Sequence, residues 1–373
     1  MMSQITQATP LLVFSNLVMI LGIYVLLKKA TKYPFILSPF RRNVSIILMF
    51  VFVMFSFWGN DYFHYLEIYP YVLQGEEFNL EYVYVWIIQN ISIGYTSFRI
   101  IVWGCALYLY LLTIRRLSIN SNIALFFFGT ICLIWFSYTR ASLAMVMVYY
   151  GMSLLYKPNK NKYISFIWGL GWILCSVFFH KSAIFAAGIS LLVYFLSKAN
   201  NKIAILCICT CFIAIMLGID TIVSSFLNMD SGEDNISSKI ISSGQGYAQN
   251  EILKRGIVSA FVSIFEVTFY YLLAWCCFSF CKGNYKDKSK DIVSYMHMLI
   301  MIVLFSSIFL LNIGIETTII FERLLRFGFI PASIVMAYFW QHGYFHGIVK
   351  FAYRLFFATT LMSVLYSMYC RLV

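Results

Sequence analysis

The feature that most constrains this chain is a series of long apolar runs separated by short charged connections. Runs such as 257–280 and 293–312 contain at most one Asp, Glu, Lys or Arg. A helix of roughly 16 to 24 such residues can cross about 30 Å of hydrocarbon. Only 11% of the residues are charged and 61% are hydrophobic, whereas soluble proteins carry about a quarter charged residues. The sequence therefore predicts an all-α polytopic integral membrane protein.

Breaks at charges, prolines and polar clusters predict about twelve transmembrane helices. They are expected at 9–27, 44–58, 97–114, 122–138, 141–156, 164–179, 183–197, 203–219, 257–280, 293–312, 325–341 and 351–369. We expect one transmembrane domain over 1–373, with an outer loop and interfacial helix at 59–96 and a second outer loop at 220–256.

The connections divide into two sets by charge. Most of the 27 Lys and Arg residues lie in alternate connections, which marks these as the cytoplasmic side. These connections are 28–43, 115–121, 157–163, 198–202, 281–292 and 342–354. Membrane orientation therefore accounts for the net charge of +12, and we expect no nucleic-acid partner.

Some cations lie on the outward side, against this trend, and binding an anion would explain them. The set comprises Arg99, Arg140, Lys181, Lys239, Lys254, Arg255, Arg323, Arg326 and Arg371. The alternative for each is a side chain that reaches lipid headgroup phosphates. For Arg326, an intrahelical pair with Glu322 is a further alternative.

Two consecutive outward hairpins each carry a cation at the tip. Arg140 lies in SYTRASLAMVMVYY, and His180 and Lys181 lie in SVFFHKSAIF. The planar fork of arginine matches pyrophosphate oxygens, and histidine is a common general base near neutral pH. We therefore expect a shared anion pocket at these tips, the alternative being a histidine that only caps its hairpin.

The segment WGNDYFHYLEIYPYV follows the second predicted span. Asp61 and His64 are three residues apart and face one direction on a helix. Tyr62 and Tyr65 alternate with them and could stack on sugars, although aromatic residues also form belts at membrane interfaces. Asp61 lies directly beyond the apolar run, where a half-solvated carboxylate is a candidate base.

The sequence contains no recognisable metal or cofactor motif. None of the ten Cys residues forms a metal-ligand pattern with His, and no P-loop, GxSxG or HExxH is present. We therefore expect no metal, disulfide or cofactor.

Four segments carry a resemblance to a known family: GNDYFHYLEIY, TRASLAMVMVYYGMSLLY, SVFFHKSAIFAAGISLLVYFL and FERLLRFGF. Over roughly residues 30 to 340 the chain resembles the EpsG family of Wzy-like polysaccharide polymerases. The resemblance implies an enzyme of the bacterial cytoplasmic membrane that polymerises undecaprenyl-pyrophosphate-linked oligosaccharide repeat units. It is also compatible with an architecture like that of the GT-C membrane glycosyltransferases. The product would be O-antigen, capsule or exopolysaccharide. The expected partners are this substrate, membrane lipids, a chain-length regulator and a flippase.

In the implied reaction a sugar hydroxyl displaces undecaprenyl pyrophosphate from the anomeric carbon of the growing chain. His180, ranked before Asp61, is the expected base. The expected substrate-binding residues are Arg140, Lys181, Arg323, Arg326, Arg255, Arg99, His64, Tyr62, Tyr65 and Glu316.

Three other functions stay open. An O-antigen ligase-like glycosyltransferase would use the same donor. A flippase or transporter should carry ionisable groups at mid-span, whereas the charges of this sequence are interpreted as lying at the outer ends. A membrane acyltransferase would place its catalytic histidine on the cytoplasmic side, where His342 and His346 lie.

Overall fold

The computed structural model describes nine segments and a few isolated positions before residue 48. The segments are 60–76, 80–132, 139–158, 161–180, 183–198, 257–283, 290–311, 324–344 and 347–369. Apart from the isolated positions, the predicted spans 9–27, 44–58 and 203–219 lie outside the described residues. Within the described segments the secondary structure is helical, with no strand.

From 97–114 onward, each predicted run except 203–219 contains a described helix, which for 122–138 ends at Ile131 and for the other runs agrees within a few residues. Two more helices lie in the predicted outer loop 59–96. Their bounds are α3 Asn60–Leu73, α4 Tyr82–Asn90, α5 Tyr95–Arg116, α6 Ser121–Ile131, α7 Thr139–Tyr156, α8 Lys162–Phe179, α9 Ala183–Lys198, α12 Ile257–Lys282, α13 Lys290–Leu311, η3 Arg326–Gly328, α15 Phe329–Gln341 and α16 Gly347–Tyr369.

Among the described residues, three helices are long and apolar enough to cross a membrane. They are Tyr95–Arg116, Lys162–Phe179 and Ile264–Lys282. Shorter apolar helices cover Ser121–Ile131, Ala183–Leu196 and Asp291–Ser307. The chain thus has the helices of a membrane protein, and the total of twelve spans stays a prediction.

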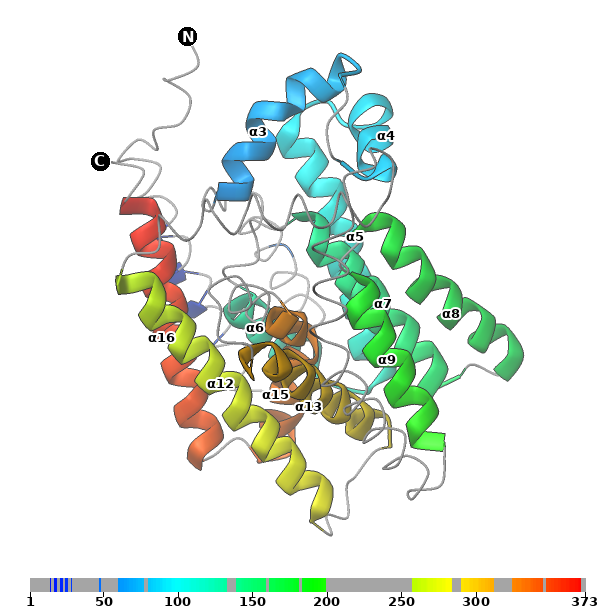
Figure 1. Cartoon of the computed structure of the whole chain (residues 1–373), viewed down its shortest axis with the longest axis vertical. Coiled ribbons are helices and arrows are strands. Elements are labelled where there is room, and N and C mark those ends of the chain that lie inside the picture. Colours follow the sequence, from blue (N-terminus) through cyan, green and yellow to red (C-terminus); the bar gives the residue numbers. More distant parts are fainter. Residues whose placement is uncertain are drawn as a thin grey trace.

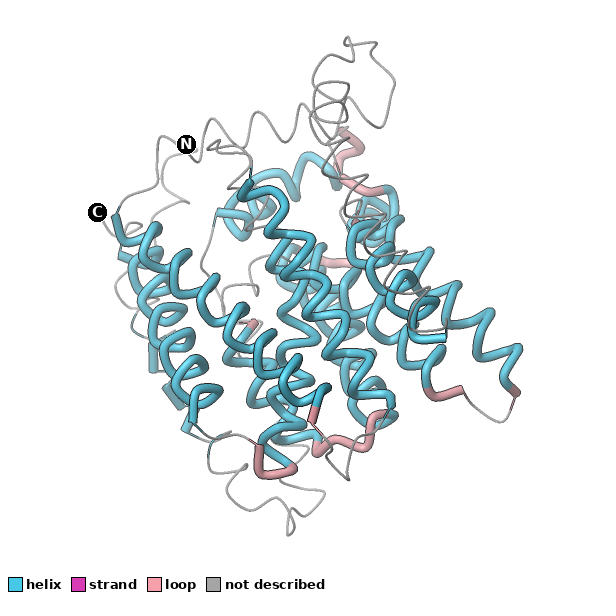
Figure 2. The backbone as a smooth tube through the Cα atoms, turned by 60° about the horizontal axis from the view of Figure 1, so that its bottom comes forward, coloured by secondary structure: helices cyan, strands magenta, loops and turns pink. Residues whose placement is uncertain are grey.

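The helices form two groups, and α13 and α15 lie between them (Figure 1). On one side α7 packs against α5, α8 and α9, and on the other α12 packs against α16 (Figure 1). Between them α13 contacts α9, α12 and α15. Figure 2 shows the same helices as tubes from a second direction. Most of the core side chains come from α5, α6, α7, α13 and α15, and the other described helices add most of the rest.

Two glycines bring α7 and α8 into close contact. A Cβ at Gly151 would lie 2.6 Å from the Gly169 carbonyl oxygen, and one at Gly169 would lie 2.7 Å from Leu155 Cδ2. Small residues let two helix backbones approach closely within a membrane. This contact places the start of α7 beside the end of α8, where Arg140 and His180 lie.

Buried tyrosine hydroxyls fix the positions of the other helices. The Tyr149 hydroxyl of α7 donates to the Phe327 carbonyl of η3 at 2.8 Å, and the Tyr295 hydroxyl of α13 donates to the Tyr149 carbonyl at 2.7 Å. Tyr110 of α5 and Ser333 of α15 share a hydrogen bond of 3.0 Å. Buried polar groups need such partners, so these bonds set the positions of the helices along their axes.

Candidate functional site

The central residue of the candidate site is Glu81, the residue immediately before α4. Its backbone is extended, and its carbonyl accepts hydrogen bonds from the Tyr84 and Val85 amides at 2.9 and 3.3 Å. The side chain makes no capping bond to its own helix. Its carboxylate instead contacts the first turn of α7 and the end of α8, and only 10% of the side chain is exposed.

Arg140, the second residue of α7, is held from three directions. Its Nη1 donates to Glu81 Oε2 at 2.5 Å, and its Nη2 donates to the Tyr65 hydroxyl. The guanidinium also lies 4.7 Å from the Tyr65 ring centroid, a cation–π distance. The Tyr84 hydroxyl donates to the Arg140 carbonyl at 2.9 Å. The Nε is buried and has no acceptor among the described residues.

His180 follows the last residue of α8 and completes the cluster. Its amide donates to the Ser176 carbonyl at 3.0 Å, which ends the helix in an extended residue. The ring Nδ1 lies 3.0 Å from Glu81 Oε1. Because an ionised carboxylate only accepts, this contact assigns the proton to Nδ1 and leaves Nε2 as an acceptor in the neutral ring. Glu81 thus binds Arg140 and His180 with its two different oxygens.

The electrostatics of Glu81 follow from these contacts. Burial alone would raise its pKa, but the hydrogen bond with His180 and the positive charge of Arg140 outweigh burial and lower the pKa to about 2. The carboxylate therefore stays ionised at neutral pH. Such a group can orient an imidazole and stabilise it once it gains a proton, as carboxylates do beside catalytic histidines.

The family assignment follows from a comparison with protein-family models. The model of the EpsG family matches residues 40–371. The chain belongs to the EpsG family. This match confirms the predicted resemblance, and the family is one of Wzy-like polysaccharide polymerases. No curated protein and no solved structure matches the chain.

Three of the predicted site residues of this EpsG family chain lie together: Arg140, His180 and Tyr65, joined directly or through Glu81. Asp61, Tyr62 and His64 lie on α3, and their side chains are not among those described. Lys181, Arg255, Glu316 and Arg323 lie outside the described residues. Roles for these residues stay predictions.

Arg326 lies away from the Glu81 cluster, further along the axis of α7. The Tyr149 bond to Phe327 places η3 nine residues along α7 from Arg140, which is about 13 Å of helix. Arg326 pairs there with Glu266, with Nε and Oε1 3.3 Å apart. Arg326 therefore has a partner on α12, and its predicted role in substrate binding stays a prediction.

Two charged side chains, Glu266 and Arg99, are more deeply buried than the sequence predicts. Glu266 lies well inside α12 and is 4% exposed, so it is an exception to the interpretation that charges cluster at the outer ends. Arg99 is 1% exposed in the first turns of α5, which excludes a side chain extended to lipid headgroups.

Sequence reasoning missed Glu81 and Tyr84 in this EpsG protein. Glu81 precedes YVYVWIIQN, a short apolar run, and an acidic or polar residue before such a run is a helix-start signal. That signal predicts a helix but gives no reason to link Glu81 with Arg140 or His180. Within the described residues, no group of three or more His, Cys, Asp or Glu residues could hold a metal ion.

Proposed function

We propose that this chain polymerises undecaprenyl-pyrophosphate-linked oligosaccharide repeat units by glycosyl transfer on the outer face of the bacterial cytoplasmic membrane. The contact of Glu81 with both Arg140 and His180 carries the proposal. It supplies a positioned base beside a cation, and the EpsG family membership supplies the polysaccharide class.

In the proposed step, the hydroxyl oxygen of the incoming repeat unit bonds to the anomeric carbon of the growing chain. The bond from that carbon to the pyrophosphate oxygen breaks, and undecaprenyl pyrophosphate leaves with the electron pair. The hydroxyl proton passes to His180 Nε2. Glu81 acts as a positioning residue, because its Oε1 holds the proton of Nδ1 and keeps Nε2 an acceptor.

The charge of the cluster suits the leaving group. Glu81 and Arg140 together are neutral, so proton transfer to a neutral His180 gives the three groups a net charge of +1. This positive charge arises as negative charge develops on the pyrophosphate. The buried Nε of Arg140 offers one N–H to a substrate oxygen. Lys181, Arg323 and Arg255 are proposed further contacts for the pyrophosphate, and Asp61 is the alternative base.

The deciding experiment incubates the purified full chain in lipid vesicles with lipid-linked repeat units and separates the glycans by length. Wild-type protein should give a ladder. His180→Asn keeps an N–H donor for Glu81 but lacks Nε2, so the ladder should form about 10²- to 10⁴-fold more slowly. His342→Asn is the matched control. His342 follows α15 and lies near the C-terminal end of α5, whereas the Glu81 cluster lies near the N-terminal end of that helix.

Normal polymerisation by His180→Asn would exclude His180 as the base. Loss of the ladder in both His→Asn variants would mean that the assay reports folding rather than chemistry. Circular dichroism and detergent gel filtration of each variant separate these outcomes, since a folded but inactive His180→Asn is the expected result.

A second candidate is a flippase for the same lipid-linked oligosaccharide, and the Glu266–Arg326 pair favours it. Buried ion pairs within membrane segments are typical of substrate pathways in transporters. Transbilayer movement of the substrate without a glycan ladder would support the flippase and contradict the polymerase. In that case Glu266→Gln should stop movement while His180→Asn leaves it unchanged.

A further inference from the structure

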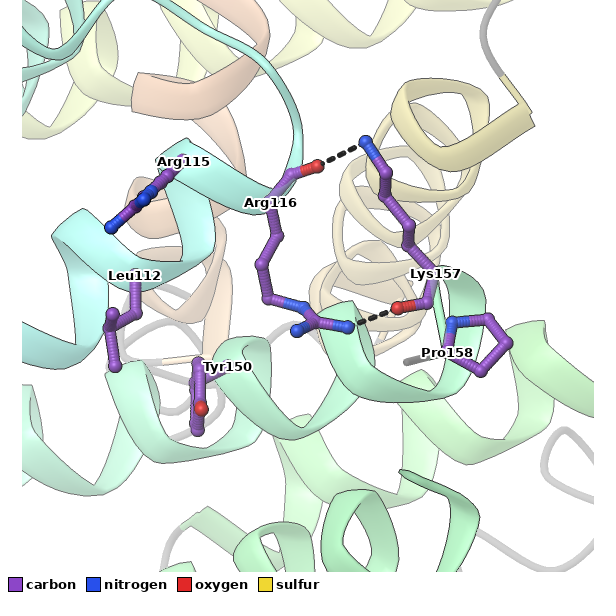
Figure 3. Close-up of a pocket in the computed structure, with 6 residues that line it drawn as sticks. All are labelled: Leu112, Arg115, Arg116, Tyr150, Lys157 and Pro158. Carbon is purple, nitrogen blue, oxygen red and sulfur yellow. Dashed lines mark hydrogen bonds between the residues drawn. The ribbon is translucent and has the colours of Figure 1, made fainter. Parts of the chain in front are cut away.

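A second group of cations surrounds a pocket at the far end of α5 and α7 from Glu81. The pocket has a volume of about 400 Å³, and its lining consists of Leu112, Arg115, Arg116, Tyr150, Lys157 and Pro158 (Figure 3). Arg115 and Arg116 end α5, whereas Lys157 and Pro158 follow α7. Nothing in the proposed polymerisation uses this pocket.

Two of the cations are fixed by a reciprocal pair of bonds. Arg116 Nη2 donates to the Lys157 carbonyl, and Lys157 Nζ donates to the Arg116 carbonyl at 2.7 Å. Figure 3 shows these two side chains crossing between the ends of α5 and α7. Because both acceptors are neutral, the bonds orient the two charges without cancelling them.

The charge around the pocket stays positive after its acidic neighbour is included. Asp291, at the start of α13, interacts electrostatically with Lys157 and Arg116. Arg115 adds a third cation and is exposed. Among the residues that the structure describes, three cations against one carboxylate give a net charge of +2, and arginine forks match phosphate oxygens.

The remaining lining residues extend the pocket toward the apolar part of the helices. Leu112 lies three residues before Arg115, and Tyr150 lies seven residues before Lys157, about 5 and 10 Å along their helices. Tyr150 is supported by Trp172 of α8, with ring centroids 5.5 Å apart. The lining thus combines cations at the helix ends with Leu112 and Tyr150 nearer the middle of the same helices.

We propose that this pocket binds the phosphate of an anionic membrane phospholipid, with the start of its acyl chains against Leu112 and Tyr150. A soluble phosphate would need the cations but would gain nothing from Leu112 and Tyr150. Basic pockets between membrane helices are known to take lipid headgroups. The bound lipid would bridge α5 and α7 at the end opposite the Glu81 cluster.

The test measures thermal unfolding of the purified full chain in detergent while dihexanoyl phosphatidylglycerol is added. Dihexanoyl phosphatidylcholine has the same chains and phosphate, but its ammonium is repelled by the cations. We expect half-saturation at a concentration about tenfold lower for phosphatidylglycerol. Glycerol phosphate has the headgroup chemistry without chains, and it should cause no shift at the same concentrations.

Variants assign the effect to the pocket. Arg115→Gln should weaken phosphatidylglycerol binding about fivefold, Arg115→Lys should retain it, and Arg115→Gln with Lys157→Gln should abolish the difference between the two lipids. Lys350→Gln, on α16 and outside the lining, is the control and should bind like wild type.

Three results would overturn the proposal. Equal shifts in the unfolding temperature of the wild type with both lipids would mean that these cations only set the orientation of the chain in the membrane. An equal response to glycerol phosphate would assign the pocket to soluble phosphate. Unchanged lipid selectivity in the double variant would place the lipid elsewhere.

Discussion

The two ends of α7 hold their cations in different ways. At the first turn, Arg140 is bound by the Glu81 carboxylate and the Tyr65 ring, and 15% of its side chain is exposed. Beyond the last turn, exposed Lys157 binds neutral carbonyl and hydroxyl oxygens.

The difference reflects the cost of removing charge from water. A buried cation needs an opposite charge, whereas an exposed one is stabilised by solvent and needs only a neutral acceptor. The Arg140 end is therefore a preorganised cluster in which each group depends on the others. The Lys157 end is a link between helices beside an open pocket.

The largest expected effect comes from breaking the buried pair. Arg140→Ala leaves the Glu81 carboxylate buried without its arginine, which should lower the free energy of unfolding by about 3 to 5 kcal/mol. Glu81→Ala with Arg140→Ala should recover part of this loss, because no uncompensated charge remains. Denaturant titration of each variant in mixed micelles measures both. An Arg140→Ala variant as stable as wild type would contradict the proposed interdependence.

Acid should weaken the same end. The pKa of Glu81 is lowered from 4.5 to about 2, so the ionised carboxylate stabilises the folded state fully above about pH 4.5. This contribution, about 3 kcal/mol, is lost as the pH falls from about 4.5 to 2. The Glu81→Gln variant should therefore be less stable than wild type at pH 6 and approach the stability of wild type near pH 2.

Thermal unfolding between pH 6 and pH 2.5 tests this difference. Glu76→Gln is the control, because Glu76 is exposed in the turn after α3. The difference in melting temperature between wild type and Glu81→Gln should shrink as the pH falls. A constant difference over the whole range would show that Glu81 ionisation does not stabilise the fold.

The contact that brings the two hairpin ends together can be tested at Gly151. Gly151→Ala forces a Cβ to within 2.6 Å of the Gly169 carbonyl oxygen, so α7 and α8 must separate. The expected cost is about 1 to 3 kcal/mol of unfolding free energy, with slower polymerisation because Arg140 and His180 move apart. Gly171→Ala on α8 meets nothing within 4 Å and should be neutral. Equal melting temperatures of these two variants would argue against the tight contact.

The smallest effect is expected at the opposite end of α7. Lys157→Gln removes the bond to the Arg116 carbonyl, and this exposed contact should contribute less than about 1 kcal/mol. Polymerisation should be unaffected. A loss of stability as large as that of Arg140→Ala would remove the contrast between the two ends.

Some parts of the structure were predictable because they depend on neighbouring residues. After Arg99 the α5 segment is almost entirely apolar until Arg115 and Arg116 in its last turn, so the place where this helix ends follows from local sequence. Arg140 and His180 were predictable as hairpin-tip residues for the same reason. The inference that both lie at one end follows from counting spans between charged loops.

The partners of these residues were not predictable. Glu81 is 59 residues from Arg140 and 99 from His180 in the sequence, and the Glu81–Arg140 and Glu81–His180 contacts join separate helices. Arg326 gives a further example, because its partner Glu266 lies on α12, in a separate part of the chain. A cation at a helix end has several possible acceptors, and only packing selects one.

The sequence by itself determined that this chain forms apolar helices with Arg140 and His180 at their ends, because apolar runs and turn residues act locally. The tertiary structure alone decided that Glu81 joins these two residues and that Arg326 pairs elsewhere. The physical reason is that a buried charge is stable only beside its counter-charge, and the close contact of α7 with α8 determines which charges meet.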